Sequence, residues 1–221
     1  MGKSELTKKY IFLLGRPGCG KSAVYNKLID HLKEEGLAEE FPRVDDFPKL
    51  WAKFMQDDKN EKEGKQRAYS RKTDDGGYKV VNDMMWHELL KEVNEDIIPL
   101  KKTGRIVFVE FSRDSYHSAF NNFSPDVLDH ALALYIDVPF EICWKRNVAR
   151  HEKAISEGSD DHLVSKEEME KTYKIDDGLT FAKNAPLPVE VIDNSQNGED
   201  FLDEQIRKII IILKEKYTYN L

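Results

Sequence analysis

The sequence predicts an α/β fold, a three-layer α/β/α sandwich around a mainly parallel β-sheet. Apolar runs of strand length alternate along the chain with amphipathic stretches of helix length, a pattern typical of β-α units. A glycine-rich loop joins the first of these strands to the first helix. Because 221 residues suit one α/β domain with an insert, we expect a single domain over 1–221.

The strands are expected where apolar residues follow one another. Tyr10–Leu14 is the first, and a short run that ends at Val44 adds another. Three further runs of strand length lie at 105–110, 132–138 and 189–193.

The helices are expected between these strands. The first covers 21–35, with Val24, Leu28 and Leu32 on one stripe and Gly36 as its stop signal. Further helices are expected at 82–98, 140–157 and 199–216. Two charged or polar stretches do not fit the pattern and are expected to be mobile, at 57–77 and 158–165.

Charge and composition limit the partners and the location. A formal net charge of -7 disfavours a nucleic-acid partner, because phosphate backbones attract clustered Lys and Arg. The segment 1–9 is polar and 209–213 is too short to span a bilayer, so we expect no membrane partner and a cytoplasmic location. Cys19 and Cys143 do not suggest a disulfide framework, which fits a reducing compartment. We expect a monomer or a homodimer.

The loop after the first strand matches the phosphate-loop pattern G-x-x-x-x-G-K-[ST] and consists of Gly15, Arg16, Pro17, Gly18, Cys19, Gly20, Lys21 and Ser22. Its glycines let backbone N–H groups turn toward the phosphates of ATP, and the helix N-terminus adds positive potential. Lys21 is expected to reach the β- and γ-phosphates, Ser22 to bind Mg²⁺, and Ala23 to complete the ATP-binding loop. The alternative is a glycine-rich turn that matches by chance. Cys19 is either a redox-sensitive thiol, with its pKa lowered by the helix end, or a small residue that the loop tolerates.

Phosphate loops of this type occur in kinases, GTPase switches and ATPase motors. The base-recognition pattern of a GTPase, Asn-Lys-x-Asp, is missing, and so is the LSGGQ sequence of transporters. These absences favour an ATP-dependent small-molecule kinase, a phosphotransferase. The alternative is a nucleotide-dependent switch that hydrolyses ATP or GTP slowly. A kinase needs a concave acceptor pocket that faces the γ-phosphate, whereas a flat, closed surface there would favour the switch.

Asp45, Asp46 and Phe47 follow a short apolar run, at the carboxyl end of a predicted strand. This DDF sequence resembles the one in uridine kinases and nicotinamide riboside kinases, members of the nucleoside and nucleotide kinase group of P-loop proteins. The resemblance implies that Asp45 or Asp46 accepts the proton of the phosphate-receiving hydroxyl or holds that hydroxyl. The alternative is a solvated turn or the N-cap of a helix over 47–54.

Glu110 ends a predicted strand, where an acidic residue would bind Mg²⁺ directly or through water. The alternative is a strand end that faces solvent. The next residues, Phe111-Ser112-Arg113, are faintly similar to the Glu-Arg-Ser of deoxynucleoside kinases, with Phe111 in place of their Arg. Arg113 is therefore assigned to the acceptor site.

The stretch at 140–151 resembles the helix that enters the lid of adenylate-kinase-like enzymes, which implies a mobile lid near 150–175. Arg146 and Arg150 project from one face of this helix, and the resemblance implies that they converge on the transferring phosphoryl group. The alternative is a solvated basic face, paired with glutamates of the same helix.

Asn194 and Ser195 follow the last predicted strand in a loop that resembles the adenine-contacting loop of dephospho-CoA and adenylate kinases. The resemblance implies a place in the ATP site, and the alternative is a plain turn before the last helix.

The segment 57–77 matches no part of this family, and we expect an acceptor-binding insert near 57–82. Arg67 and Arg71 form a positive cluster with Lys72, which favours an acceptor that carries phosphate or carboxylate. In the alternative, these charges pair on a mobile surface with Asp74, Asp75 and Glu63.

The remaining motifs are interpreted as structural. The six histidines show no zinc-site spacing, so Mg²⁺ is the only metal expected. Two apolar clusters are expected in the core rather than in a substrate site, and consist of Trp51, Phe54 and Met55 and of Met84, Met85 and Trp86.

Overall fold

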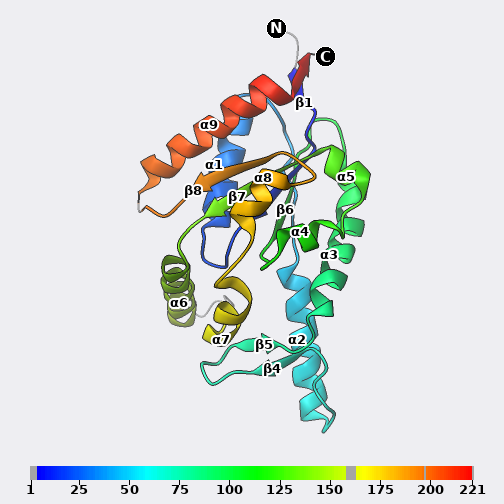
Figure 1. Ribbon diagram of the computed structural model, residues 1–221, viewed down its shortest axis with the longest axis vertical. Helices are drawn as coiled ribbons and strands as arrows, with labels where there is room; N and C mark the ends of the chain where they lie inside the picture. Colours follow the sequence, from blue (N-terminus) through cyan, green and yellow to red (C-terminus); the bar gives the residue numbers. More distant parts are fainter. Residues whose placement is uncertain (1–3, 158–162, 197, 221) are drawn as a thin grey trace.

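The structure, a computed structural model, describes residues 4–157, 163–196 and 198–220. Its centre is a five-stranded parallel β-sheet with the strand order β3-β6-β2-β7-β8 (Figure 1). These strands are β3 (Arg43–Asp45), β6 (Val107–Phe111), β2 (Tyr10–Leu14), β7 (Ala131–Asp137) and β8 (Val189–Asp193). The predicted parallel sheet is confirmed.

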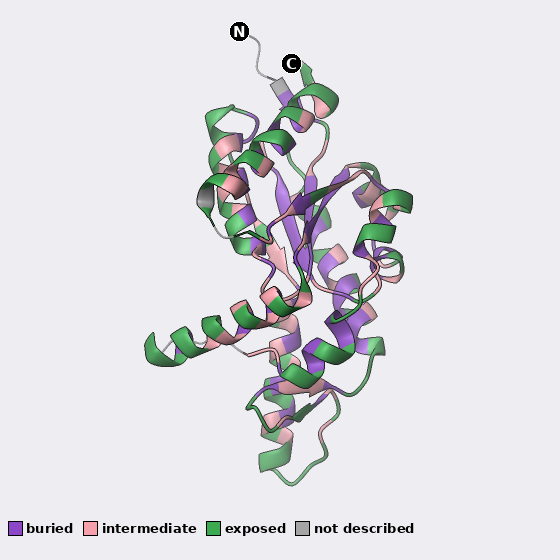
Figure 2. Cartoon of the chain, turned by 60° about the vertical axis from the view of Figure 1, so that its left-hand side comes forward, coloured by how far each residue is buried: buried purple, intermediate pink, exposed green. Residues whose placement is uncertain are grey.

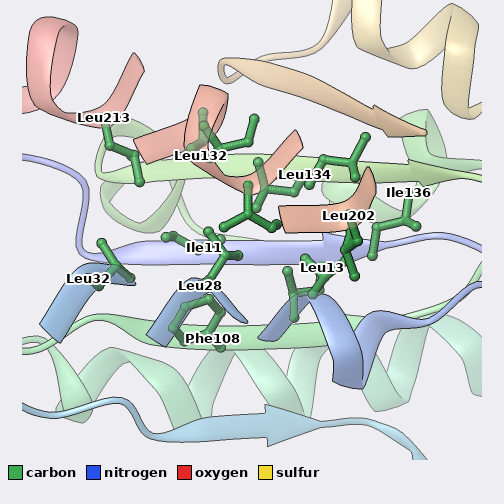
Figure 3. Packing of buried hydrophobic residues seen from close by; sticks show 14 of the residues in the cluster. Ile11, Leu13, Leu28, Leu32, Phe108, Leu132, Leu134, Ile136, Leu202 and Leu213 are labelled. Atoms are coloured by element: carbon green, nitrogen blue, oxygen red, sulfur yellow. The ribbon is translucent and has the colours of Figure 1, made fainter. Parts of the chain in front are cut away.

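One face of the sheet is covered by α1 (Lys21–Glu34) and α9 (Glu199–Tyr217). Figure 3 shows Leu28 of α1 and Leu202 of α9 directed at the side chains of β2 and its neighbours. The predicted stripe of α1 is fully buried, because Val24, Leu28 and Leu32 are each 0% exposed. Gly36, the predicted stop signal, has a φ of 65° just after the helix.

The opposite face is covered by α3 (Met84–Ile97), α4 (Tyr116–Phe120), α5 (Pro125–Asp129) and α8 (Gly178–Asn184). A 3₁₀ turn, η1 (Ile98–Leu100), contains Pro99 and follows α3, close to the predicted helix end at 98. Side chains of β2 alternate between the two faces, and Figure 2 shows its sheet buried between exposed outer helix surfaces. The predicted three-layer α/β/α sandwich is confirmed.

A second group of elements extends from one end of the sandwich (Figure 1). It comprises α2 (Phe47–Lys62), the antiparallel hairpin of β4 (Ser70–Lys72) and β5 (Tyr78–Val80), α6 (Phe140–Glu157), α7 (Lys166–Glu168) and the π-helical turn η2 (Met169–Tyr173). Of the stretch at 57–77, where no regular element was predicted, 57–62 lies in α2 and 70–72 forms β4. Of the other stretch expected to be mobile, 158–162 lies outside the described residues.

Asp57 explains why α2 and the hairpin fold together. This carboxylate is 0% exposed and accepts the backbone N–H groups of Ala68, Tyr69 and Ser70 at 2.7, 2.8 and 2.7 Å. Burial alone would raise the pKa of Asp57, but these hydrogen bonds outweigh it and lower the pKa. One side chain of α2 therefore fixes the start of β4.

At the other end of the sandwich, β1 (Ser4–Leu6) pairs with β9 (Thr218–Asn220) in an antiparallel two-stranded sheet. No helix in the described part of the chain has the length and apolar character needed to cross a membrane.

Candidate active site

The loop between β2 and α1 turns on three glycines. Gly15, Gly18 and Gly20 have φ angles of 137°, 83° and 97°, in the left-handed region that favours glycine. The Gly15 N–H donates to the Tyr116 hydroxyl at 2.9 Å, and a Cβ on Gly18 would collide with the backbone carbonyl of Cys143. The close packing holds the loop at the N-terminus of α1, where backbone N–H groups favour an anion.

Lys21 is held inside this loop. Its Nζ donates to the Gly15 carbonyl at 3.0 Å and to Ser112 Oγ at 2.9 Å, and the residue is 8% exposed. Burial alone would lower the pKa of Lys21, but the carboxylates of Glu110 and Asp45 help to raise it. The side chain therefore stays positively charged. Ser112 was not predicted, because a serine after a strand carries no motif of its own.

The side chains of two loop residues are engaged or buried within the protein. Arg16 donates from Nε to the Tyr173 carbonyl at 2.7 Å and pairs with Asp176 at 3.0 Å. Arg16 therefore ties the loop to residues 173 and 176, at the end of the predicted lid. Cys19 is 0% exposed, and burial raises the pKa of its thiol, so the hypothesis of a thiol with a lowered pKa is wrong.

Arg43 joins the two residues predicted to bind Mg²⁺. Its Nη2 donates to Ser22 Oγ at 3.0 Å, and its Nε donates to Glu110 Oε2 at 3.0 Å. Glu110 is only 9% exposed and also lies 4.0 Å from Lys21 Nζ, so the alternative of a solvent-facing strand end is wrong. Sequence reasoning missed Arg43, because its partners come from other elements.

The donor set fits a magnesium ion. A hydroxyl and a carboxylate are hard oxygen ligands, and both already contact one positively charged group. Among the described residues, no group of three or more His, Cys, Asp or Glu side chains could hold a metal ion. Mg²⁺ at this position would therefore depend on Ser22, Glu110 and the phosphate oxygens of a nucleotide.

The adjacent aspartates lie in different surroundings. Asp45 pairs in register with Glu110 across β3 and β6, and its Oδ1 accepts the N–H of Phe47, the first residue of α2, at 2.8 Å. Burial raises the pKa of Asp45 to about 7, with Glu110 and Asp46 adding to the effect. Asp46 is 6% exposed and forms an ion pair with Arg113 Nη2 at 2.6 Å.

Arg113 is buried beside the aromatic ring of Trp86. Its guanidinium carbon lies 4.5 Å from the ring centroid, and the side chain is 5% exposed. Its Nε has no hydrogen-bond partner among the described residues. Phe111, the residue in place of the deoxynucleoside-kinase arginine, is buried in the core at 1% exposure.

A single cavity of about 500 Å³ connects these groups. Of the residues assigned to the site from the sequence, it brings together Pro17, Gly18, Gly20, Lys21, Ser22, Asp45, Asp46, Glu110, Arg113, Arg146 and Arg150. It is not lined by Gly15, Arg16, Cys19, Ala23, Asn194, Ser195, Arg67 or Arg71. The cavity wall also includes Trp51, Phe54 and Trp86, which were expected in the core. Tyr78 of β5 lines it as well and comes from the segment 57–82 that was expected to bind the acceptor.

Asn194 acts as a brace for the loop. Its Nδ2 donates to the Cys19 carbonyl at 2.8 Å, and its own carbonyl accepts a hydrogen bond from Arg146 Nη1 at 3.0 Å. The Ser195 N–H donates to Asp193 Oδ1 at 2.8 Å, as in a plain turn. The contact of Asn194 and Ser195 with adenine stays a prediction.

Arg150, the second predicted arginine of α6, donates from Nη2 to Asn147 Oδ1 at 3.4 Å.

The arginines of the hairpin lie outside the cavity. Arg67 pairs with Asp58 at 2.6 Å and donates from Nε to the Ser70 carbonyl at 2.8 Å, while Arg71 pairs with Glu167. Their partners differ from the expected Asp74, Asp75 and Glu63. The assignment of Arg67 and Arg71 to the acceptor site stays a prediction.

No protein-family model matches the chain, and no curated protein matches its sequence. Solved structures are similar to it over nearly its whole length. The Mycobacterium tuberculosis APS kinase CysC, in complex with AMPPNP and APS, is 15% identical with a TM-score of 0.52, covering 94% of this chain and 98% of that chain. A gluconokinase from Sinorhizobium meliloti 1021 is 13% identical with a TM-score of 0.52, covering 95% of both chains. At these identities, the similarity shows the fold, which is that of P-loop small-molecule kinases.

Proposed function

We propose that this chain, which has the fold of P-loop small-molecule kinases, transfers the γ-phosphoryl group of ATP to a hydroxyl of a small molecule. The observation that carries the proposal is the cavity of about 500 Å³ that joins Lys21 and Ser22 to Asp45 and to the hairpin. A switch that only hydrolyses a nucleotide needs no such second compartment. The concave surface therefore favours a kinase over a switch.

At the nucleotide end, the loop N–H groups and Lys21 bind the phosphates of ATP. Ser22 and Glu110 would hold Mg²⁺, which would supply positive charge to the phosphate oxygens. Arg146 and Arg150 line the same cavity from α6, where they can interact with the transferred group.

At the acceptor end, Asp45 and Asp46 have separate roles. Asp46 is committed to Arg113 by its ion pair, so it positions that arginine. Asp45 lines the cavity next to Glu110 and is the residue that takes the hydroxyl proton. As that proton leaves, the acceptor oxygen bonds to the γ-phosphorus, the bond from this phosphorus to the β–γ bridging oxygen breaks, and ADP departs.

An ADP-release assay with a panel of nucleosides, nucleotides, sugars and sugar acids tests the proposal. At least one acceptor is expected to exceed the blank without acceptor. Lys21→Ala is expected to lower kcat by about 100-fold or more with that acceptor. The variant removes the positive charge that stabilises the β- and γ-phosphates.

The matched control is Lys27→Ala, which removes a lysine of the same helix that does not line the cavity. Its kcat is expected to equal that of the unmodified protein. Melting temperatures show whether either variant is unfolded. Failure of every acceptor, or full activity in Lys21→Ala, would contradict the kinase function.

A further inference from the structure

Aromatic side chains form the part of the cavity wall that α2, β5 and α3 build. Phe47, Trp51 and Phe54 come from α2, Tyr78 from β5 and Trp86 from α3. The rings of Trp51 and Tyr78 are nearly perpendicular, with centroids 5.5 Å apart, and those of Phe47 and Trp51 are stacked at 6.1 Å. Trp51 and Tyr78 are only partly buried. Aromatic surface in a recess of this kind suits a flat apolar ring.

The apolar character of this wall continues between the rings. Leu50 and Val80 also line the cavity and are buried. Glu168, a charged residue at the same end, accepts the Val80 N–H at 3.0 Å and the Thr172 hydroxyl. Its carboxylate is therefore already engaged within the protein.

The charges at this end do not favour an anionic ligand. The lining cation Arg113 contacts the ring of Trp86, and it already pairs with Asp46. An anion placed beside Arg113 would also meet the Asp46 carboxylate. Arg67 and Arg71 lie outside the cavity in ion pairs of their own. A buried charge without a partner is costly, so this end favours an uncharged molecule.

Two buried polar atoms of residues that line the cavity have no hydrogen-bond partner in the described part of the chain, Asp46 Oδ2 and Arg113 Nε. Asp46 Oδ2 already lies in the ion pair with Arg113 Nη2, whereas Arg113 Nε remains for recognition of a ligand. It can donate one hydrogen bond to a carbonyl or ring nitrogen at the edge of a flat ring that lies near Trp86.

We propose that the phosphoryl acceptor is an uncharged alcohol that carries a flat aromatic ring with a hydrogen-bond acceptor at its edge. The ring lies along Trp51 and Tyr78, its edge meets Arg113, and its hydroxyl reaches Asp45. This inference rests on the proposed function, because it identifies the occupant of the acceptor end.

Calorimetry in the presence of Mg²⁺ and a saturating non-hydrolysable ATP analogue tests the ligand class. Uridine and thymidine are the nucleoside probes, and pyridoxine is a ring alcohol that is not a nucleoside. The monophosphates of these three compounds add charge to the same rings, while gluconate and shikimate are anionic without an aromatic ring. At least one uncharged ring alcohol is expected to bind about tenfold or more tightly than its monophosphate.

The results with these compounds distinguish a nucleoside from another aromatic alcohol, and a failure of this inference from a failure of the kinase function. If the nucleosides bind and pyridoxine does not, the acceptor is a nucleoside. If pyridoxine binds and the nucleosides do not, the acceptor is another aromatic alcohol. The inference is overturned if no ring alcohol binds, if a monophosphate binds as tightly as its alcohol, or if gluconate or shikimate binds best. Phosphorylation of gluconate alone would refute the inference and keep the kinase. Tight binding of a ring alcohol without ADP release for any acceptor would refute the kinase and keep the ring site.

Variants test whether the rings touch the ligand or only pack together. Trp51→Leu is expected to weaken binding of the ring alcohol about tenfold, with affinity for the ATP analogue unchanged. Trp51→Phe keeps a ring and is expected to recover most of the affinity. Tyr69→Leu is the matched control, because Tyr69 packs on the same aromatic cluster without lining the cavity. If Trp51→Leu and Tyr69→Leu bind the ring alcohol with equal affinity, Trp51 does not contact the ligand.

Discussion

Arg43 places a positive charge between the two oxygens that are proposed to hold Mg²⁺. Its guanidinium contacts both Ser22 Oγ and Glu110, so Mg²⁺ and Arg43 compete for the same oxygen atoms. Arg43→Ala is expected to lower the Mg²⁺ concentration that half-saturates binding of an ATP analogue by about tenfold, which is the scale of one charge-assisted hydrogen bond. A calorimetric Mg²⁺ titration at fixed analogue concentration measures this.

Arg105→Ala is the control for this titration. Arg105 donates from Nε to Glu40 Oε2 at 2.8 Å, an ion pair of similar kind that does not line the cavity. The control is expected to keep the original Mg²⁺ midpoint. An unchanged or higher midpoint in Arg43→Ala would mean that the arginine does not compete with the ion.

Asp45 gives the metal-free protein a defined pH dependence. Burial raises the pKa of Asp45 to about 7 in the folded state, against an ordinary value of 3.8. The folded protein therefore holds the Asp45 proton more tightly than the unfolded chain, and this contribution to stability is lost as pH rises from about 4 to about 7. Asp45→Asn cannot lose a proton, so it is expected to remove this part of the decline.

Urea unfolding across this pH range, without Mg²⁺ or nucleotide, measures the effect. Asp30→Asn changes an exposed aspartate of α1 and is expected to keep the original slope of stability against pH. The same slope in Asp45→Asn and in the unmodified protein would refute the prediction.

The sequence could not tell Asp45 from Asp46, although it predicted where both lie. They are adjacent and chemically identical, and the DDF resemblance implies a role for either. Their different roles depend on Arg113, which comes from a distant part of the chain and forms its ion pair with Asp46. Contacts between distant elements of this kind are not encoded in local residue patterns.

At the scale of elements, the unit of α2 and the β4–β5 hairpin depends on one carboxylate. Asp57→Ala would leave three backbone N–H groups without their acceptor, at about 1–3 kcal/mol for each group that stays buried. We expect the free energy of unfolding to fall by about 3 kcal/mol or more. Amide hydrogen exchange at Ala68, Tyr69 and Ser70 is expected to accelerate more than exchange in β2, and urea unfolding measures the stability.

Asp74→Ala is the control for this prediction. Asp74 is an exposed residue in the turn of the same hairpin. Its replacement is expected to change stability by less than about 0.5 kcal/mol. A loss of similar size in both variants would show that Asp57 does not hold the unit together.

Elements that apolar burial stabilises could be predicted from the sequence, whereas an element that a buried polar contact stabilises could not. Tyr10–Leu14 was predicted with correct bounds, because a strand covered on both faces is a continuous apolar run. The hairpin was missed, because its strands are three residues long and carry exposed Arg71 and Lys72. A buried hydrogen-bonded carboxylate stabilises it, and such a group leaves no periodic pattern.

At the scale of the whole molecule, the cavity lies where the sandwich meets its extension (Figure 1). The phosphate loop and the ends of β3 and β6 belong to the sandwich, and their position at its edge was predicted from the order of strands. The opposite wall comes from α2, β5, α3 and α6, segments that are far apart in the chain. The sequence therefore predicted the nucleotide end of the cavity, whereas the aromatic end required the assembled fold.

The positions of the tryptophans allow acceptor binding to be followed by intrinsic fluorescence. Of the three tryptophans in the sequence, Trp51 and Trp86 line the cavity, whereas Trp144 packs against the cluster beneath α1 and α9. A ring that settles along the cavity wall would displace water from two indoles and leave the third unchanged. We expect acceptor binding to shift the intrinsic fluorescence emission, to the same extent in Trp144→Phe but by a smaller amount in Trp51→Phe and Trp86→Phe. Loss of the spectral shift in Trp144→Phe alone would instead locate the acceptor near α6, away from the aromatic wall.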